Sequence, residues 1–247
     1  SSETSFHALI KHKYVLHVHS TATIANAISQ SSESDLKKYL DEDFIFVPYC
    51  RPGFTLTMEI KKLILPSTNI LILENHGLIV AGDDIEDTYK LLLKIHKKLD
   101  LIRNEKLAFD YLEKITNIDG YIHKNTDKYK LFSTQNEKLF SLFPKSFYPD
   151  HVIFLGPGIP TFLEDKEANE FIQNLKRRNI DLPPYLILKY KGLFENTLAI
   201  PAAKEMIDCF LEVLLRIDLS KSLKFLSSQQ ESELLNWDIE IYRQSIN

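Results

Sequence analysis

Three histidines are spaced so that they could bind one metal ion. His17 and His19 lie two residues apart in a β-branched, alternating segment, and His76 stands beside Gly77 further along the chain. Residues two apart in a strand project from the same face, so His17 and His19 would point to one side. Imidazole is the commonest metal ligand near neutral pH, and three protein ligands leave the fourth position of a catalytic zinc open. The pattern indicates a catalytic metal centre; the alternative is that these histidines only pack or hydrogen-bond in a sheet.

An acidic residue precedes the first two histidines. Glu3 follows Ser1 and Ser2 in the opening segment, and a carboxylate close to such a site is a candidate general base. Nothing in the sequence around Cys50 indicates an activated thiolate, so we expect no cysteine nucleophile.

The histidines require a strand and a hairpin to position them. Alternation over residues 14–19 predicts a strand, and residues 69–82 predict two strands joined by a tight turn or bulge at His76 and Gly77. Residues 44–47 predict a buried strand that ends at a proline. Helices are expected at residues 4–12, 22–28, 56–65 and 83–114, with a polar stretch at 29–35.

The second half of the chain repeats this pattern imperfectly. Residues 71–78 align with residues 186–193, and residues 44–48 align with residues 152–156. In each half a long amphipathic helix follows. One interpretation is a duplicated α/β module, since a repeated unit buries its apolar face by the same packing rule. The other is that any two strand–turn–helix units look alike at this level.

The second copy would hold no metal. Lys191 stands where the first copy has His76, and no His-x-His segment precedes it. A duplication predicts that residues 152–155 and 185–189 are neighbouring strands. It also predicts that the helix from Pro201 packs on their sheet, as the helix over 83–114 packs on the first.

Composition excludes several classes of protein. The 247 residues allow one large domain or two modest ones, and 44% hydrophobic and 26% charged residues are typical of a globular chain. No apolar run reaches the roughly 18 residues of a membrane span. The net charge of −4 gives no general reason to expect nucleic acid or an anionic membrane, and the 7 glycines form no nucleotide-binding motif. Two cysteines, Cys50 and Cys209, fit a reducing cytoplasm.

An ordered set of motifs over roughly residues 1–115 resembles the class II aldolase/adducin family. The matching pieces are Ser1-Ser2-Glu3 before a helix, His17-Val18-His19 at a strand end, Val47-Pro48-Tyr49 with Pro52-Gly53, and Asn75-His76-Gly77-Leu78-Ile79 with Gly82. Residues 148–152 and 237–243 are similar to the longer branch of that family. This branch includes the aldolase part of bifunctional rhamnulose-1-phosphate aldolase/dehydrogenase-like proteins.

The resemblance implies a three-layer α/β fold, in which helices flank a mostly antiparallel central sheet, and a homo-oligomer, a tetramer in the family. We expect a class II aldolase-like domain over residues 1–118, a linker over 119–145, and a smaller α/β module over 146–247. Family members carry a further stretch before the Ser-Ser-Glu loop. Either the printed sequence omits it, or the protein is a truncated relative.

The resemblance also implies roles for single residues. Glu3 would be the catalytic acid/base, and Ser1 and Ser2 would bind the substrate phosphate. The ligands of Zn²⁺, or of another divalent metal, would be His17, His19 and His76.

These roles imply a cytoplasmic, metal-dependent lyase that cleaves a ketose phosphate by retro-aldol chemistry. Its partner would be a small-molecule sugar phosphate, with neither nucleic acid nor membrane. The alternatives are a dehydratase or an epimerase on the same metal site, or a non-catalytic adducin-like scaffold. The epimerase ranks lower, because that branch carries aspartate in place of Glu3.

Overall fold

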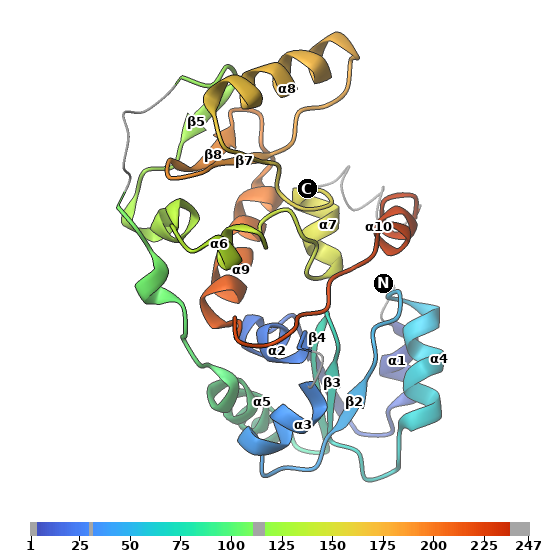
Figure 1. The fold of residues 1–247 in the computed structure, drawn as a ribbon. Coiled ribbons are helices and arrows are strands. Elements are labelled where there is room, and N and C mark those ends of the chain that lie inside the picture. Colours follow the sequence, from blue (N-terminus) through green and yellow to red (C-terminus); the bar gives the residue numbers. More distant parts are fainter. Residues whose placement is uncertain (1–3, 30–31, 111–116, 238–247) are drawn as a thin grey trace.

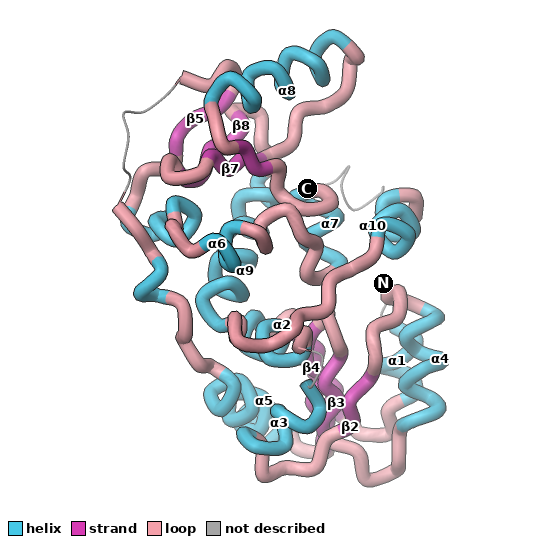
Figure 2. The backbone as a smooth tube through the Cα atoms, viewed as in Figure 1, coloured by secondary structure: helices cyan, strands magenta, loops and turns pink. Residues whose placement is uncertain are grey.

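The structure is a computed structural model that describes residues 4–29, 32–110 and 117–237 (Figure 1). Ser1, Ser2 and Glu3 lie outside these residues. Within them the chain forms two four-stranded sheets with helices around each (Figure 2). No helix in the described ranges is long and apolar enough to cross a lipid bilayer.

The first sheet is mostly antiparallel, as predicted, with the strand order β1-β4-β3-β2. β1 (Tyr14–Val18) and β3 (Ile70–Leu73) each pair antiparallel with β4 (Gly77–Gly82). β2 (Ile45–Val47) joins the far side of β3 in parallel. The predicted strand and hairpin are therefore present. The strand expected over residues 44–47 is present too, but it lies at the edge of the sheet and only Val47 in it is buried.

Helices cover both faces of this sheet and complete three layers. α1 (Thr4–Leu9) and α4 (Phe54–Leu63) pack on one face. α2 (Thr21–Ala27), α3 (Ser32–Tyr39) and α5 (Ile85–Leu99) pack on the other (Figure 1). Every residue of β3 is buried, because alternate side chains enter opposite apolar cores.

The second sheet has the same order of pairing, β5-β8-β7-β6. β5 (Tyr121–His123) and β7 (Tyr185–Leu188) pair antiparallel with β8 (Gly192–Asn196), and β6 (Thr161–Phe162) pairs in parallel with β7. α8 (Asp165–Arg177) lies between β6 and β7 in sequence, as α4 lies between β2 and β3. This matches the topology that a duplicated module predicts, while an origin by duplication stays a prediction.

A large apolar core joins the two halves of the chain. α9 (Pro201–Arg216) packs mainly against α2 and against α7 (Pro149–Leu155). α10 (Ser228–Leu235) packs on the other side of α7. α9 shares this core with Tyr185, Ile187 and Leu193 of the second sheet, as predicted. It differs from α5 because its main partners are the helices α2 and α7 rather than the sheet.

The expected linker over residues 119–145 is not a linker. It contains β5, the 3₁₀ helix η2 (Asp127–Ser133) and α6 (Glu137–Phe140). Phe132 and Leu139 are fully buried in the core that joins the halves. A run of polar residues just after β5 concealed these elements in the sequence.

The expected strand over residues 152–155 is wrong, because these residues belong to helix α7. Pro149 occupies its first turn, where a missing amide is tolerated, and Gly156, with φ 89°, follows its last residue. An apolar run that is buried on most sides does not distinguish a strand from a helix. The short strand β6 takes the position expected for residues 152–155.

The helix expected over residues 83–114 ends at Leu99. Beyond it, the amides of Arg103 and Asn104 donate to the carbonyl oxygen of Leu215 at 2.9 and 3.0 Å. The chain therefore leaves the helix and provides donors for a backbone carbonyl in the last turn of α9. The periodicity of apolar residues in the sequence does not reveal such a long-range contact.

Two other predicted boundaries differ. The first helix is shorter than residues 4–12, and the polar stretch at 29–35 runs into α3. On α3, Lys37 pairs with Glu33 at 2.8 Å while Leu36 is buried. Because the helix contributes so few apolar side chains, its periodicity is weak.

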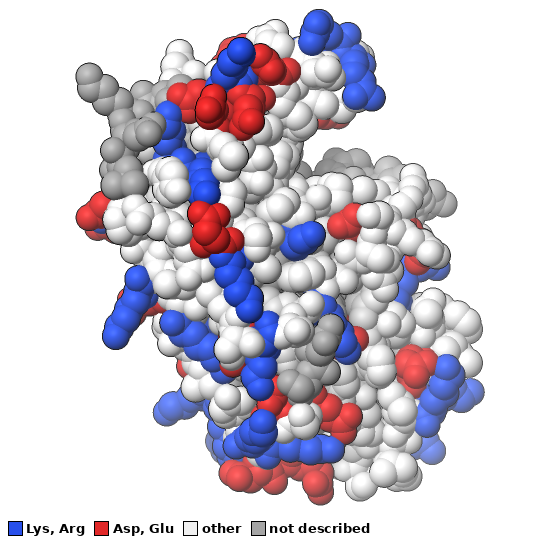
Figure 3. Space-filling model, in the orientation of Figure 1, with Lys and Arg blue, Asp and Glu red and all other residues white. Residues whose placement is uncertain are grey.

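Charged side chains of both signs lie over the face shown in Figure 3. Some form pairs, such as Lys98 Nζ with Glu42 Oε2 at 2.9 Å and Lys176 Nζ with Asp119 Oδ2 at 2.6 Å. Surface pairs contribute about 0–1 kcal/mol each, so the fold rests chiefly on its apolar cores.

Candidate metal centre

His17, His19 and His76 meet at one end of the first sheet. His17 lies in β1, His19 follows that strand, and His76 ends the turn between β3 and β4. The ring centroid of His17 lies 5.1 Å from the centroid of His19 and 5.1 Å from that of His76. The centroids of His19 and His76 are 4.8 Å apart. One ligand nitrogen from each ring lies within 4.8 Å of the others. The structure thus brings together the three histidines that the sequence analysis selected.

The turn that presents His76 has a defined backbone. Leu73 pairs with Gly77, so the three residues between them form the turn. Asn75 has φ 53°, a left-handed conformation that asparagine adopts more readily than most residues. The amide of His76 donates to the carbonyl oxygen of Leu73 at 3.2 Å, and the His76 side chain is buried.

Gly77 allows this turn to approach the end of β1. A Cβ atom at Gly77 would collide with the carbonyl oxygen of Val18 and lie 3.2 Å from Cα of His19. Any side chain at this position would push the turn with His76 away from the strand that carries the other two histidines.

The ring of His17 is held by the backbone and by an aromatic neighbour. Its Nδ1 lies 3.0 Å from the carbonyl oxygen of Leu78. A carbonyl only accepts, so Nδ1 donates and Nε2 of the neutral ring carries the lone pair. Phe6 of α1 packs edge-on against the ring at 5.4 Å. Both contacts fix the ring in an orientation suited to a metal ligand.

The ring of His19 contacts the second half of the chain. Its Nδ1 lies 2.9 Å from Oδ2 of Asp150, in the first turn of α7. Because an ionised carboxylate only accepts, the ring donates through Nδ1 here as well. Nε2 of the neutral ring then carries the lone pair.

The turn that carries His76 is braced by both halves. Nδ2 of Asn75 donates to the carbonyl oxygens of Phe147 at 2.8 Å and Lys224 at 3.0 Å. The buried Glu74 accepts from the amide of Tyr49 at 2.9 Å and from the ammonium group of Lys224. The second half therefore contacts the site at several points.

These supporting residues were missed in the sequence analysis. Asp150 lies inside residues 148–152, which resemble the longer branch of the family. That resemblance draws attention to the segment but gives Asp150 no role. Asn75 likewise lies in a family motif, at residues 75–79, and the resemblance gives it no role either. Nothing in the sequence alone connects Lys224 with Glu74. Ser1, Ser2 and Glu3 lie outside the described residues, and their roles stay predictions.

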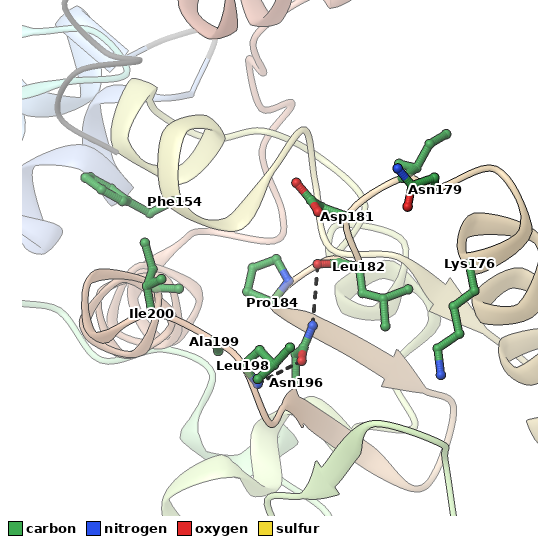
Figure 4. Close-up of a pocket in the computed structure, with 12 residues that line it drawn as sticks. Phe154, Lys176, Asn179, Asp181, Leu182, Pro184, Asn196, Leu198, Ala199 and Ile200 are labelled. Atoms are coloured by element: carbon green, nitrogen blue, oxygen red, sulfur yellow. Dashed lines mark hydrogen bonds between the residues drawn. The ribbon is translucent and has the colours of Figure 1, made fainter. Parts of the chain in front are cut away.

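A separate pocket of about 590 Å³ lies in the second half (Figure 4). Apolar side chains such as Leu198 and Ile200 line it, and Nδ2 of Asn196 donates to the carbonyl oxygen of Leu182 at 3.5 Å. Its charged lining residues are Lys176 and Asp181, and none of the described lining residues is a histidine or cysteine. The histidine cluster is therefore the better candidate for chemistry.

Comparison with known proteins identifies the first part of the chain. Residues 1–101 match the sequence model of the Class II Aldolase and Adducin N-terminal domain. These residues belong to the class II aldolase/adducin family. The matched region contains all three histidines, whereas Asp150 lies outside it.

Two relatives are similar over part of their length. The "Uncharacterized oxidoreductase YuxG" of Bacillus subtilis (strain 168) is 29% identical over 109 residues, which are 43% of this chain and 16% of the relative. A solved structure, the N-terminal class II aldolase domain of a conserved protein from Thermoplasma acidophilum, is 28% identical with a TM-score of 0.38. That match covers 40% of this chain and 46% of the other. The chain therefore spans less than half the length of either relative.

Proposed function

We propose that the chain is a metal-dependent aldehyde-lyase of the class II aldolase type, which cleaves a ketose phosphate by retro-aldol chemistry. The observation that carries the proposal is the convergence of three histidine nitrogens within 4.8 Å of one another, inside the family domain. Three imidazole ligands are typical of a catalytic zinc, whose fourth position is open to substrate.

The residues of the site fit such an ion. Imidazole nitrogen suits Zn²⁺ and several other divalent metals. At His17 and His19 the hydrogen bond at Nδ1 leaves Nε2 as the basic atom, as a metal ligand requires. When bound, a divalent ion would supply Lewis-acid polarisation of the substrate's carbonyl oxygen.

The remaining work falls to the chain's own side chains. In retro-aldol cleavage the substrate's hydroxyl loses its proton, the carbon–carbon bond breaks, and the carbon that keeps the electron pair takes up a proton. We assign movement of the proton at the reacting carbon to Glu3, and binding of the phosphate to Ser1 and Ser2. Family resemblance supports these three assignments.

Two further features of the chain belong to the same proposal. Cys50 and Cys209 are both free thiols, which supports a reducing compartment such as the cytoplasm. A homo-tetramer follows from the family resemblance, and light scattering of the purified chain tests it.

The test is a metal-dependent cleavage assay on a panel of ketose phosphates. We expect zinc-loaded protein to release a three-carbon ketone phosphate and an aldehyde. His76→Ala should abolish this activity, while His12→Ala, at a histidine outside the cluster, should retain it. A sugar phosphate that is dehydrated or epimerised instead would support those alternatives on the same metal site. A chain that binds no metal and turns over no sugar phosphate would support the adducin-like scaffold.

A further inference from the structure

We propose that Asp150 is a positioning residue of the metal centre, supplied by the second half of the chain to orient His19. The inference rests on the proposed function in one respect, namely that the three histidines bind a divalent ion. It assigns to the second half a part in metal binding beyond general support of the fold.

The geometry of the contact is that of a carboxylate behind a metal ligand. Oδ2 of Asp150 lies 2.9 Å from Nδ1 of His19, and the Asp150 side chain is only 13% exposed. Ligating histidines usually donate their second ring nitrogen to a carboxylate or a carbonyl, which fixes the tautomer and raises the basicity of the ligand atom. His17 uses a carbonyl of its own sheet for this purpose, whereas His19 uses a carboxylate from the other half.

The backbone around Asp150 is firmly placed. Its neighbours Pro149 and His151 are both buried, as is Val152 one residue further on. The helix that carries them is packed between α9 and α10. The carboxylate therefore projects from a rigid support, as accurate orientation of a ring requires.

The same segment also contacts the turn that carries the third histidine. The carbonyl oxygen of Phe147 accepts from Asn75, which directly precedes His76. Residues 147–150 thus contact one predicted ligand, His19, and the residue that directly precedes another, His76. If the pair of His19 and Asp150 served the fold alone, breaking it would change the stability of the protein but not its affinity for metal. Measuring metal affinity therefore distinguishes a positioning role from a purely structural one.

The experiment measures Zn²⁺ affinity by competition with a chromogenic chelator, without any substrate. The variants are Asp150→Ala, Asp150→Asn and Asp150→Glu. The matched control is Asp165→Asn, because Asp165 is a carboxylate of the second half that pairs with Lys191 at 2.7 Å. The visible spectrum of Co²⁺-loaded protein provides a second readout of ligand geometry.

We expect Asp150→Ala to weaken zinc binding about 10- to 100-fold and to change the Co²⁺ spectrum. Asp150→Asn should fall between this variant and the wild type, because an amide oxygen still accepts from Nδ1 but carries no charge. Asp150→Glu should recover part of the loss, and the control should bind zinc as the wild type does.

Wild-type affinity and an unchanged Co²⁺ spectrum in Asp150→Ala would overturn the inference, provided that His76→Ala abolishes binding. If Asp150→Ala does not fold, the near-isosteric Asp150→Asn decides by the same criterion. A wild-type chain that binds no zinc would overturn the proposed function and this inference together. Binding by the wild type that is indifferent to Asp150 would overturn this inference alone.

Discussion

His123 occupies in the second sheet the position that His17 occupies in the first. His17 pairs with Ile79 on β4, and His123 pairs with Phe194 on β8. Each partner lies two residues after the glycine that opens its strand. The correspondence of the two sheets therefore extends from strand order to the register of single residues.

The other two ligand positions differ between the halves. Asn125 corresponds to His19, and Lys191 corresponds to His76. The ammonium group of Lys191 lies 2.7 Å from both carboxylate oxygens of Asp165. An ammonium donates only and cannot ligate a metal, so an internal ion pair stands where the first half gathers imidazoles.

This difference predicts the effect of Lys191→Ala. The variant should lose about 1 kcal/mol of unfolding free energy or less, because it breaks a partly exposed ion pair. It should bind the same amount of zinc as the wild type, since the metal centre lies in the first half. Urea unfolding and metal analysis check the two statements, and a loss of bound zinc would place the metal in the second half.

Gly77→Ala should weaken metal binding by at least about tenfold. The added methyl group meets the backbone between His17 and His19, so the turn with His76 must move away. The matched control is Gly82→Ala at the other end of β4, where a Cβ would meet the side chain of Thr88 instead. Titration with zinc tests both variants, and equal affinities would show that the close approach is not required.

Glu3→Gln should keep the metal and lose activity. If Glu3 moves the proton, turnover should fall by about 10²- to 10⁴-fold with unchanged zinc content. Glu33→Gln, at an exposed position on α3, serves as the control. Turnover that stays at the wild-type rate in Glu3→Gln would assign the proton transfer to another group.

His151 should make the fold sensitive to acid. Burial lowers the pKa of this histidine to about 3, and among the described residues neither ring nitrogen has a hydrogen-bond partner. Below pH of about 6.5 the unfolded chain binds a proton that the folded chain does not, so stability falls with pH until about pH 3. Above pH of about 6.5 the ring is neutral in both states and leaves the stability unchanged, whereas within the window it disfavours the folded state.

The variant His151→Phe should lack this part of the pH dependence while keeping the contacts with Phe147 and Phe210. Between pH 7 and pH 5 the wild type should lose about 2 kcal/mol more unfolding free energy than the variant. Urea unfolding at the two pH values gives the comparison. Identical losses in both proteins would show that His151 is not held neutral by the fold.

Local patterns predicted the parts of the site that depend on local structure. The alternation that predicts β1 places His17 and His19 on one side, and the hairpin signal places His76 in a turn. The three-layer arrangement of the first sheet followed from the family resemblance.

Contacts between distant segments were not predictable in this way. Asp150 reaches His19 only because α7 is a helix packed between α9 and α10, and the apolar residues of α7 suggested a strand. The amphipathic pattern of the sequence continues beyond Leu99, yet α5 ends at that residue. The segment that follows donates hydrogen bonds to α9 instead of extending the helix. In both cases tertiary packing overrode the local signal.

The most direct test of the account is X-ray absorption spectroscopy of the zinc-loaded chain. We expect one zinc ion per chain with three imidazole nitrogens at about 2.0–2.1 Å. We also expect one of these three nitrogens to disappear in each of His17→Ala, His19→Ala and His76→Ala. Sulfur at about 2.3 Å, fewer than three imidazoles in the wild type, or the same zinc environment in all three variants would contradict these expectations.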